Sequence, residues 1–341
     1  PDIDKIYMTF VQATTGGGGW PMSVFITPEK NPFFGGTYFR KPDFMNLCGR
    51  VNELWHDAEK RPLIERDAKK MREGLAENST RKIDPNAKLN HGLLTNGLAQ
   101  IKATYDPRHG GFGDKPKFPR PCEPAFVLWQ AARTEDKDGI GMVTHTCERM
   151  AAGGMYDQLG GGFSRYSVDE MWLVPHFEKM LYDNAQLIHL YLDAYLVSGD
   201  ARHAAVVRDI IRYLRRDMTH KGGGWYSAED ADSEGQEGKF YCWTKVELEK
   251  ILNEEEAAVV VRHYGITEHG NFEDHSHPDP LKNLNVLSIV DAKLTDTDKA
   301  LLVSARKKMN AVRTKRVRPH LDDKILSSWN GLMLGAVARA Y

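Results

Sequence analysis

Hydrophobic positions follow two different patterns in the early and the later part of the chain. Near the start, short apolar runs at 22–26 and 33–39 flank a proline-containing turn, and charged helical segments follow. Two strand-like runs joined by a tight turn predict a β-hairpin. The glycines before Trp20 and Pro21 make this X-Pro bond a candidate for a cis peptide. We therefore expect an α/β domain over residues 1–80.

The later part, 91–341, follows a polar segment at 81–90 that reads as a linker. The segment before Gly199 is apolar almost all round, as in a helix that is buried on most sides. The next segment, 201–218, carries one apolar stripe opposite a face of arginines, which indicates an outer helix. An inner helix followed by an outer one is the repeating unit of an α/α toroid.

Three loops of similar sequence separate these helices. They read YDPRHGGFG from Tyr105, YDQLGGGFSRY from Tyr156 and HKGGGWY from His220. Their spacing of roughly 50 to 60 residues is that of one helical hairpin with its loops. Loops of this kind are expected to gather at one end of the toroid, and functional residues concentrate on such loops.

The richest chemistry lies between Gly153 and Asp183. Aromatic side chains that can stack on a ring occur there beside acids, bases and a histidine that can move protons, which is typical of a sugar site. The candidates in this stretch are Arg165, Tyr166, Asp169, Trp172, His176, Lys179 and Asp183. Pro175 is suited to the first position of a helix. In such a helix His176, Lys179 and Asp183 would share one face, with Glu178 pointing away.

Two further clusters of acids are candidates. Glu229 and Asp230 lie in the segment SAEDADS, where close carboxylates either raise each other's pKa or bind a cation, or simply form a polar turn. Asp322 and Asp323 precede an apolar helix that carries Trp329. The dipole at a helix start would also favour these two acids without any function.

Two other features bear on ligands. Phe118, in the rigid segment PKFPRP, is a possible stacking platform. Four histidines lie near Glu273 and Asp274, at His263, His269, His275 and His277. Their spacing fits no common zinc pattern, so we predict neither a metal site nor a cofactor.

The composition limits the function classes. The chain has 341 residues, 41% hydrophobic, and a formal charge of −1, as in an ordinary globular protein. This charge gives no reason to expect nucleic acid or a membrane surface as a partner. Apolar runs fall short of the roughly 20 residues that span a bilayer.

The cysteines and the chain ends bear on the location. Four scattered cysteines without a Cys-x-x-Cys pair favour a reducing compartment, with the cytoplasm as the first expectation. The chain starts at Pro1 without a methionine and stops in an apolar helical run. We interpret it as an internal piece of a longer protein, which leaves an organellar matrix possible.

Several long motifs resemble the spermatogenesis-associated protein 20 family and its bacterial relatives. They occur in order along essentially the whole chain: GGGGWPMSVFITP, FFGGTYF, PKFPRP, GGGFSRYSVDEMWLVPHFEKMLYDNAQL, GGGWYSAEDADSEG, KFYCWT, HYGI and LDDKILSSWNGLM. The resemblance implies a thioredoxin-like domain joined to an (α/α)6 barrel of the six-hairpin glycosidase type, incomplete in this chain. It also implies that Trp20-Pro21 is the cis-proline step of the thioredoxin-like part. The barrel class includes N-acylglucosamine 2-epimerases and glycosidases, but the family supplies no proven catalytic residues.

These observations lead to a sugar-active enzyme as the first hypothesis. In an epimerase, His176 would be the base, Asp169 or Asp183 would orient it, and Arg165 or Lys179 would stabilise an enolate. In a glycosidase, Glu229 or Asp230 would act together with Asp169.

The remaining candidates, Phe118, Tyr166, Trp172, Asp322, Asp323 and Trp329, would contact a small sugar-like ligand. Two alternatives stay open. One is a thiol redox or protein-folding factor, which requires a cysteine pair that this chain lacks. The other is a non-catalytic binder of a glycan or a protein.

Overall fold

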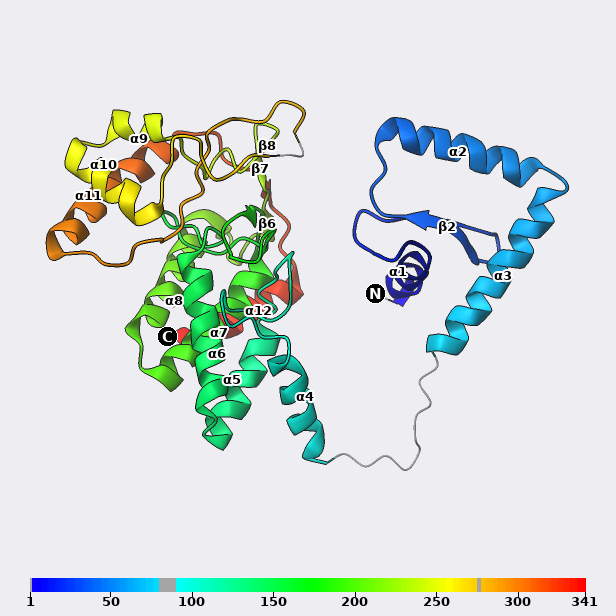
Figure 1. Ribbon diagram of the computed structural model, residues 1–341, viewed down its shortest axis with the longest axis horizontal. Coiled ribbons are helices and arrows are strands. Elements are labelled where there is room, and N and C mark those ends of the chain that lie inside the picture. The colour runs from blue at the N-terminus through cyan, green and yellow to red at the C-terminus, as the bar shows by residue number, and fades with distance from the viewer. Residues whose placement is uncertain (1, 80–89, 275–276) are drawn as a thin grey trace. The chain divides into compact units, whose positions relative to one another are not determined.

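The computed structural model describes residues 2–79, 90–274 and 277–341. Its contacts divide the chain into two compact units, Pro1–Leu89 and Asn90–Tyr341 (Figure 1). Each unit is described by itself. Most of the predicted linker, 81–89, lies outside the described residues.

The first unit consists of a β-hairpin and three helices. Phe25 pairs with Phe34 across the antiparallel strands, which confirms the predicted hairpin. Helices α1 and α3 both pack against the second strand. The Trp20-Pro21 peptide is cis, as predicted. The elements are α1 Asp2–Thr15, β1 Ser23–Ile26, β2 Pro32–Gly36, α2 Lys41–His56 and α3 Lys60–Ser79.

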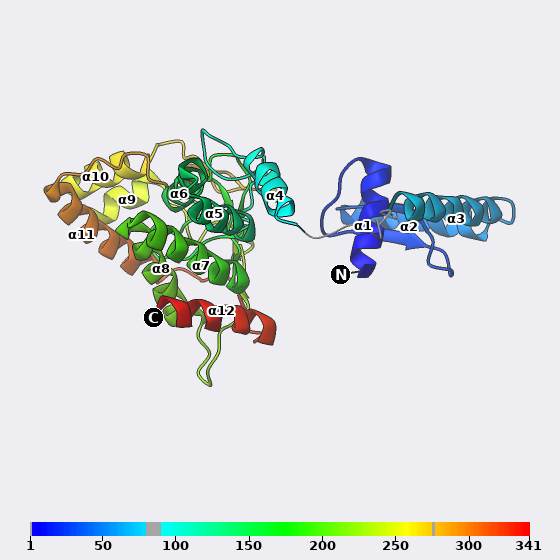
Figure 2. The ribbon, with the colours of Figure 1, turned by 90° about the horizontal axis from the view of Figure 1, so that it is seen from below.

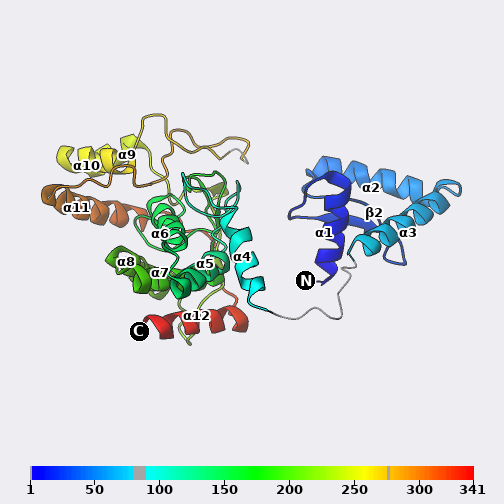
Figure 3. The same ribbon diagram turned by 60° about the horizontal axis from the view of Figure 1, so that its bottom comes forward.

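The second unit is mainly helical and is built around α7. This helix packs against α5, α6, α8 and α12, and half of its residues are buried (Figure 3). Helix α8 buries only its apolar stripe, so the predicted inner and outer helices are confirmed. The helices of this group are α4 Gly92–Lys102, α5 Cys122–Thr134, α6 Lys137–Ala152, α7 Leu181–Ser198, α8 Ala201–Tyr213, the π-turn η1 Leu214–Met218 and α12 Ser327–Ala340.

Three further helices form a separate group with its own core (Figure 2). They are α9 Lys245–Ile251, α10 Glu254–Tyr264 and α11 Asp296–Arg313. Trp243, Tyr264 and Met309 are buried among them. Thr244 and Glu247 form a capping box at the start of α9, as expected from the sequence.

The predicted helix start at Pro175 is wrong. Pro175–His176 is a short strand, β4, which pairs with β3 Tyr166–Ser167. Lys179–Met180 is strand β5 and pairs with β6 Ala228–Glu229, which in turn pairs with β9 Leu321–Asp322. Helix α7 begins only at Leu181, so His176, Lys179 and Asp183 do not share a helix face. Backbone pairing with distant segments here overrides the local preference of proline.

Candidate active site

The first two Gly-aromatic loops have the same internal construction. Asp106 Oδ1 accepts hydrogen bonds from the amides two and three residues further on, and Asp157 Oδ1 does the same in the second loop. Lys117 Nζ lies 2.7 Å from Asp106 Oδ2 and donates to the Gly110 carbonyl. Lys179 Nζ lies 2.9 Å from Asp157 Oδ2 and donates to Gly161 in the same way.

The third loop is a variant of this construction. It closes with a bridge between Thr219 and Trp225, and the ring of His220 accepts from the Gly222 amide where the other loops use an aspartate. The predicted loop repeat is therefore present in the structure. A bridge between Lys117 and Ser167 ties the first loop to the strand after the second.

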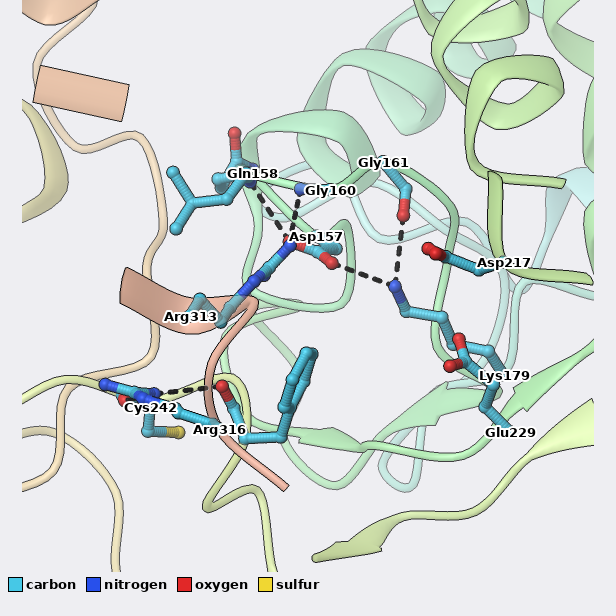
Figure 4. Close-up of polar contacts among 12 residues, drawn as sticks. Asp157, Gln158, Gly160, Gly161, Lys179, Asp217, Glu229, Cys242, Arg313 and Arg316 are labelled. Atoms are coloured by element: carbon cyan, nitrogen blue, oxygen red, sulfur yellow. Dashed lines mark hydrogen bonds and ion pairs between the residues drawn. The ribbon is translucent and has the colours of Figure 1, made fainter. Parts of the chain in front are cut away.

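Behind the second loop lies a buried cluster of ions (Figure 4). Asp157 is paired with Arg313 at 2.7 Å and with Lys179, whose side chain is 2% exposed. Burial alone would raise the pKa of Asp157, but the charges of Arg313 and Lys179 hold it well below its usual value. Glu229 accepts from Tyr213 Oη at 2.7 Å and pairs with Arg318.

This cluster corrects two predictions. Lys179 and Glu229 hold the second loop against strands β5 and β6, and neither offers a free polar atom to a ligand. Their buried charges are matched by partners, as structural ion pairs require.

A group of partly exposed ionisable side chains lies around His176. Its Nδ1 is 2.8 Å from Glu237 Oε1, and its Nε2 is 3.7 Å from Glu178 Oε2. Glu178 Oε2 also pairs with Arg165 Nη1 at 3.0 Å. Burial lowers the pKa of His176, but the hydrogen bonds to Glu178 and Glu237 outweigh it and raise the pKa to about 9. The imidazole is therefore charged at neutral pH.

Aromatic rings flank this group. Tyr166 stacks on the ring of His176 with centroids 5.1 Å apart, and Phe118 stacks on Tyr166 at 4.6 Å. Trp329 lies edge-on to Tyr182, 4.8 Å away. Phe118, Tyr166 and Trp329 were predicted to contact a ligand, and in the structure their rings contact other rings of the protein; Tyr182 was not named in the sequence analysis.

Asp183 adds a second unusual group in the first turn of α7. Its side chain is buried, and its Oδ2 has no hydrogen-bond partner within the described ranges. Burial raises its pKa to about 7, and Arg165 lowers it only in part. Asp183 is therefore able to hold a proton near neutral pH.

Asp169 does not orient His176, contrary to prediction. Its carboxylate accepts the amides of Met171, Leu173 and Val174, which fixes the turn between β3 and β4. Trp172 is completely buried, and its Nε1 donates to the carbonyl of His109. It has no free face for a ligand, which corrects its predicted role.

The other predicted acids serve local structure. Asp230 accepts the next amide in the chain, from Ala231. Asp322 pairs with Lys324 at 2.6 Å. Asp323 is exposed and lies beside this pair.

Sequence reasoning missed Glu237 and underrated Glu178. Glu237 lies in a small hairpin of β7 Asp232–Ser233 and β8 Gln236–Glu237, far along the chain from His176. The only sequence feature that marks Glu237 is its position in a turn between two glycines. Glu178 was predicted to point away from His176 because the sequence analysis assumed a helix at this segment.

The histidine-rich segment does not form a site within the part of the chain that is described. The rings of His263 and His277 contact the backbone carbonyls of Asp291 and Asp279, and His275 lies outside the described residues. The four cysteines are free. Burial raises the pKa of the Cys147 and Cys242 thiols, which makes both poor nucleophiles. No helix in the described ranges is long and apolar enough to cross a membrane.

Comparison with known proteins gives one family model and several relatives. Residues 1–76 match the model Thioredox_DsbH, described as a protein of unknown function, DUF255, which confirms the thioredoxin-like first part. Among solved structures, a cellobiose 2-epimerase from Bacillus thermoamylovorans is 12% identical, with a TM-score of 0.36 and 42% of each chain covered. An unsaturated glucuronyl hydrolase specific for heparin is 10% identical, with a TM-score of 0.38 over 99% of this chain and 96% of that one.

The sequence relatives are much more similar. Spermatogenesis-associated protein 20 of Homo sapiens is 39% identical over 99% of this chain and 48% of its own length. An uncharacterized protein of Caenorhabditis elegans is 35% identical over 100% of this chain and 51% of its own. The chain spans about half the length of the curated relatives it matches. The resemblance seen in the motifs is thereby confirmed: over nearly its whole length, this chain is a homologue of spermatogenesis-associated protein 20.

Proposed function

We propose that the helical unit is the part of a carbohydrate-active enzyme that holds the reacting groups, and that the reaction is an epimerisation or isomerisation. The observation that carries this proposal is the His176 imidazole, held between Glu237 and Glu178 at the edge of an aromatic stack. Arg165 and Asp183 complete the group.

The surroundings of His176 suit a sugar-like ligand. The ring of Phe118, 37% exposed and stacked on Tyr166, offers an apolar face, and sugar rings present a matching face of C–H groups. Arg165 and Glu178 are partly exposed beside it and can bind hydroxyl or carbonyl oxygens. An apolar wall with a few polar groups is the usual composition of a site for a small polar ligand.

The positions of the acids favour epimerisation over hydrolysis. The carboxylates considered for hydrolysis were Glu229, Asp230 and Asp169. Both carboxylate oxygens of Glu229 are paired with buried side chains. The carboxylate of Asp169 accepts hydrogen bonds from three backbone amides. Asp230, the third of them, is exposed and accepts the amide of Ala231. The group around His176 offers a charged imidazole, a guanidinium and a carboxylate, which suits proton transfer next to a carbonyl.

The proposed steps use these groups in turn. The charged His176 and Arg165 polarise the carbonyl of the open sugar. Glu178, whose pKa is lowered first by its hydrogen bond with His176, removes the proton from the neighbouring carbon. The electron pair of that C–H bond forms a C=C bond with the carbonyl carbon while the carbonyl π pair moves to the oxygen, giving an enolate that Arg165 stabilises. Asp183, protonated near neutral pH, returns a proton to the opposite face.

Hydrogen exchange tests this directly. The protein would be incubated in D2O with reducing sugars such as N-acetylglucosamine and cellobiose, and deuterium at C2 followed by NMR. We expect exchange in the unaltered protein and a loss of roughly 10²–10³-fold in His176→Ala, the usual effect of removing a donor that stabilises a developing oxyanion. His189→Ala, on α7 away from the group, is the matched control.

A second candidate function is binding without turnover, favoured by the Phe118–Tyr166–His176 stack itself. In that case the sugars bind, but C2 does not exchange. Exchange that persists in His176→Ala, with the control unchanged, would rule out the assignment of His176 as a reacting group.

A further inference from the structure

Outside the candidate active site, three potential metal ligands meet at the corner between α7 and α8. Glu148 belongs to α6, Asp200 precedes α8, and His203 lies in the first turn of α8. A carboxylate oxygen of each acid and a ring nitrogen of His203 all lie within 4.8 Å of one another. They are the one such group of three within residues 2–79, 90–274 and 277–341.

The histidine is the unusual member. His203 is only 2% exposed, and its Nε2 has no hydrogen-bond partner among the described residues. A buried nitrogen without a partner costs free energy, which a ligand would recover.

One arginine side chain joins the two carboxylates. Asp200 also caps α8, since its Oδ1 accepts the amide of Arg202. The Arg202 guanidinium bridges Asp200 and Glu148 at 2.5 and 2.6 Å. Its side chain is 71% exposed, so it can swing into solvent at low cost. The arginine therefore occupies the place that a cation would take.

We propose that Glu148, Asp200 and His203 form a binding site for a divalent first-row transition metal ion, with Arg202 as an internal competitor for the two carboxylates. One imidazole with two carboxylates suits zinc, cobalt or manganese better than calcium or magnesium, which prefer oxygen ligands.

A bound ion would join α6 to the start of α8, two helices that already touch (Figure 1). The site would thus link one helical hairpin to the next. Because it binds the folded chain and not the separated ligands, the ion would raise the melting temperature.

Calorimetric titration of the metal-free protein with ZnCl2 tests the proposal, with CoCl2 as a spectroscopic probe of an imidazole ligand. We expect one ion per chain, and a loss of affinity of at least about tenfold in His203→Gln. Glu148→Gln, at a partly exposed position, should lose affinity as well and keeps the test valid if the His203 variant folds poorly. Arg202→Ala should bind zinc more tightly than the unaltered protein.

His189→Ala and His91→Ala are the controls, and both should keep the affinity of the unaltered chain. The proposal is overturned if the unaltered protein binds no zinc. It is equally overturned if Glu148→Gln and His203→Gln bind as the controls do, because the ion would then sit on other surface groups. A lower affinity in Arg202→Ala would also contradict it.

Discussion

Nδ1 of His176 lies 2.8 Å from Oε1 of Glu237, although the two residues are 61 positions apart in the chain. The contact brings a two-residue strand and a small glycine-bounded hairpin together. Glu237 also accepts the Phe177 amide, so its carboxylate fixes both the ring and the backbone beside it. Together with Glu178, this contact raises the pKa of His176 and keeps the imidazole charged at neutral pH.

Glu237→Gln should lower the pKa of His176, because an amide stabilises the imidazolium less than a carboxylate does. An NMR titration of the His176 ring should give about 9 in the unaltered protein and a clearly lower value in the variant. An unchanged titration would show that Glu237 does not control this charge.

His176 should also make stability depend on pH. Its folded-state pKa lies above the ordinary value of 6.5, so its contribution is complete below about pH 6.5 and is lost as pH rises through about 9. Chemical denaturation between pH 6 and 10 should therefore show that the free energy of unfolding falls more steeply with pH in the unaltered protein than in His176→Asn. Parallel curves would contradict the raised pKa.

Asp183→Asn should remove a pH dependence of the same sign, for a different reason. The buried carboxyl has its pKa raised to about 7, so the folded chain holds more protons than the unfolded chain between about pH 4 and 7. Stability then falls as pH rises through this window. Relative to the unaltered protein, the variant should therefore become more stable as pH rises from 4 to 8. Urea unfolding at each pH measures this difference in the free energy of unfolding.

Lys179→Met should destabilise the chain by about 3–5 kcal/mol, because it leaves the buried Asp157 with one partner fewer. Lys299→Met is the matched control, since Lys299 is 62% exposed in its pair with Asp296. The control should change the free energy of unfolding by less than about 1 kcal/mol. Similar losses in both variants would show that the buried pair is not special.

Gly162→Ala should lower the free energy of unfolding by about 2 kcal/mol or more. Its φ is +81°, and an added Cβ would lie 2.6 Å from Tyr213 Cδ1. Gly141→Ala, inside α6 with open space around the added carbon, should instead stabilise the chain by up to about 1 kcal/mol. Thermal denaturation of the two variants checks the opposite signs.

The sequence by itself determined the features that depend on short segments. The hairpin around Phe25, the buried α7, the one-sided α8 and the repeated Gly-aromatic loops follow from periodicity and turn chemistry within a few residues. Phe118 and Tyr166 were predicted from their motifs to contact a ligand; in the structure their rings stack on each other, and the contact with a ligand stays a prediction.

Only the tertiary structure decided which ionisable groups reach an open surface. Pro175 looked like a helix start, but pairing of β4 with β3 delayed the helix to Leu181 and turned Glu178 towards His176. Glu229 was predicted as a catalytic acid and Glu237 was not, yet the structure buries Glu229 against Tyr213 and Arg318 and places Glu237 beside His176. Local patterns record a residue's preference, whereas burial and ion pairing depend on partners that the sequence places far away.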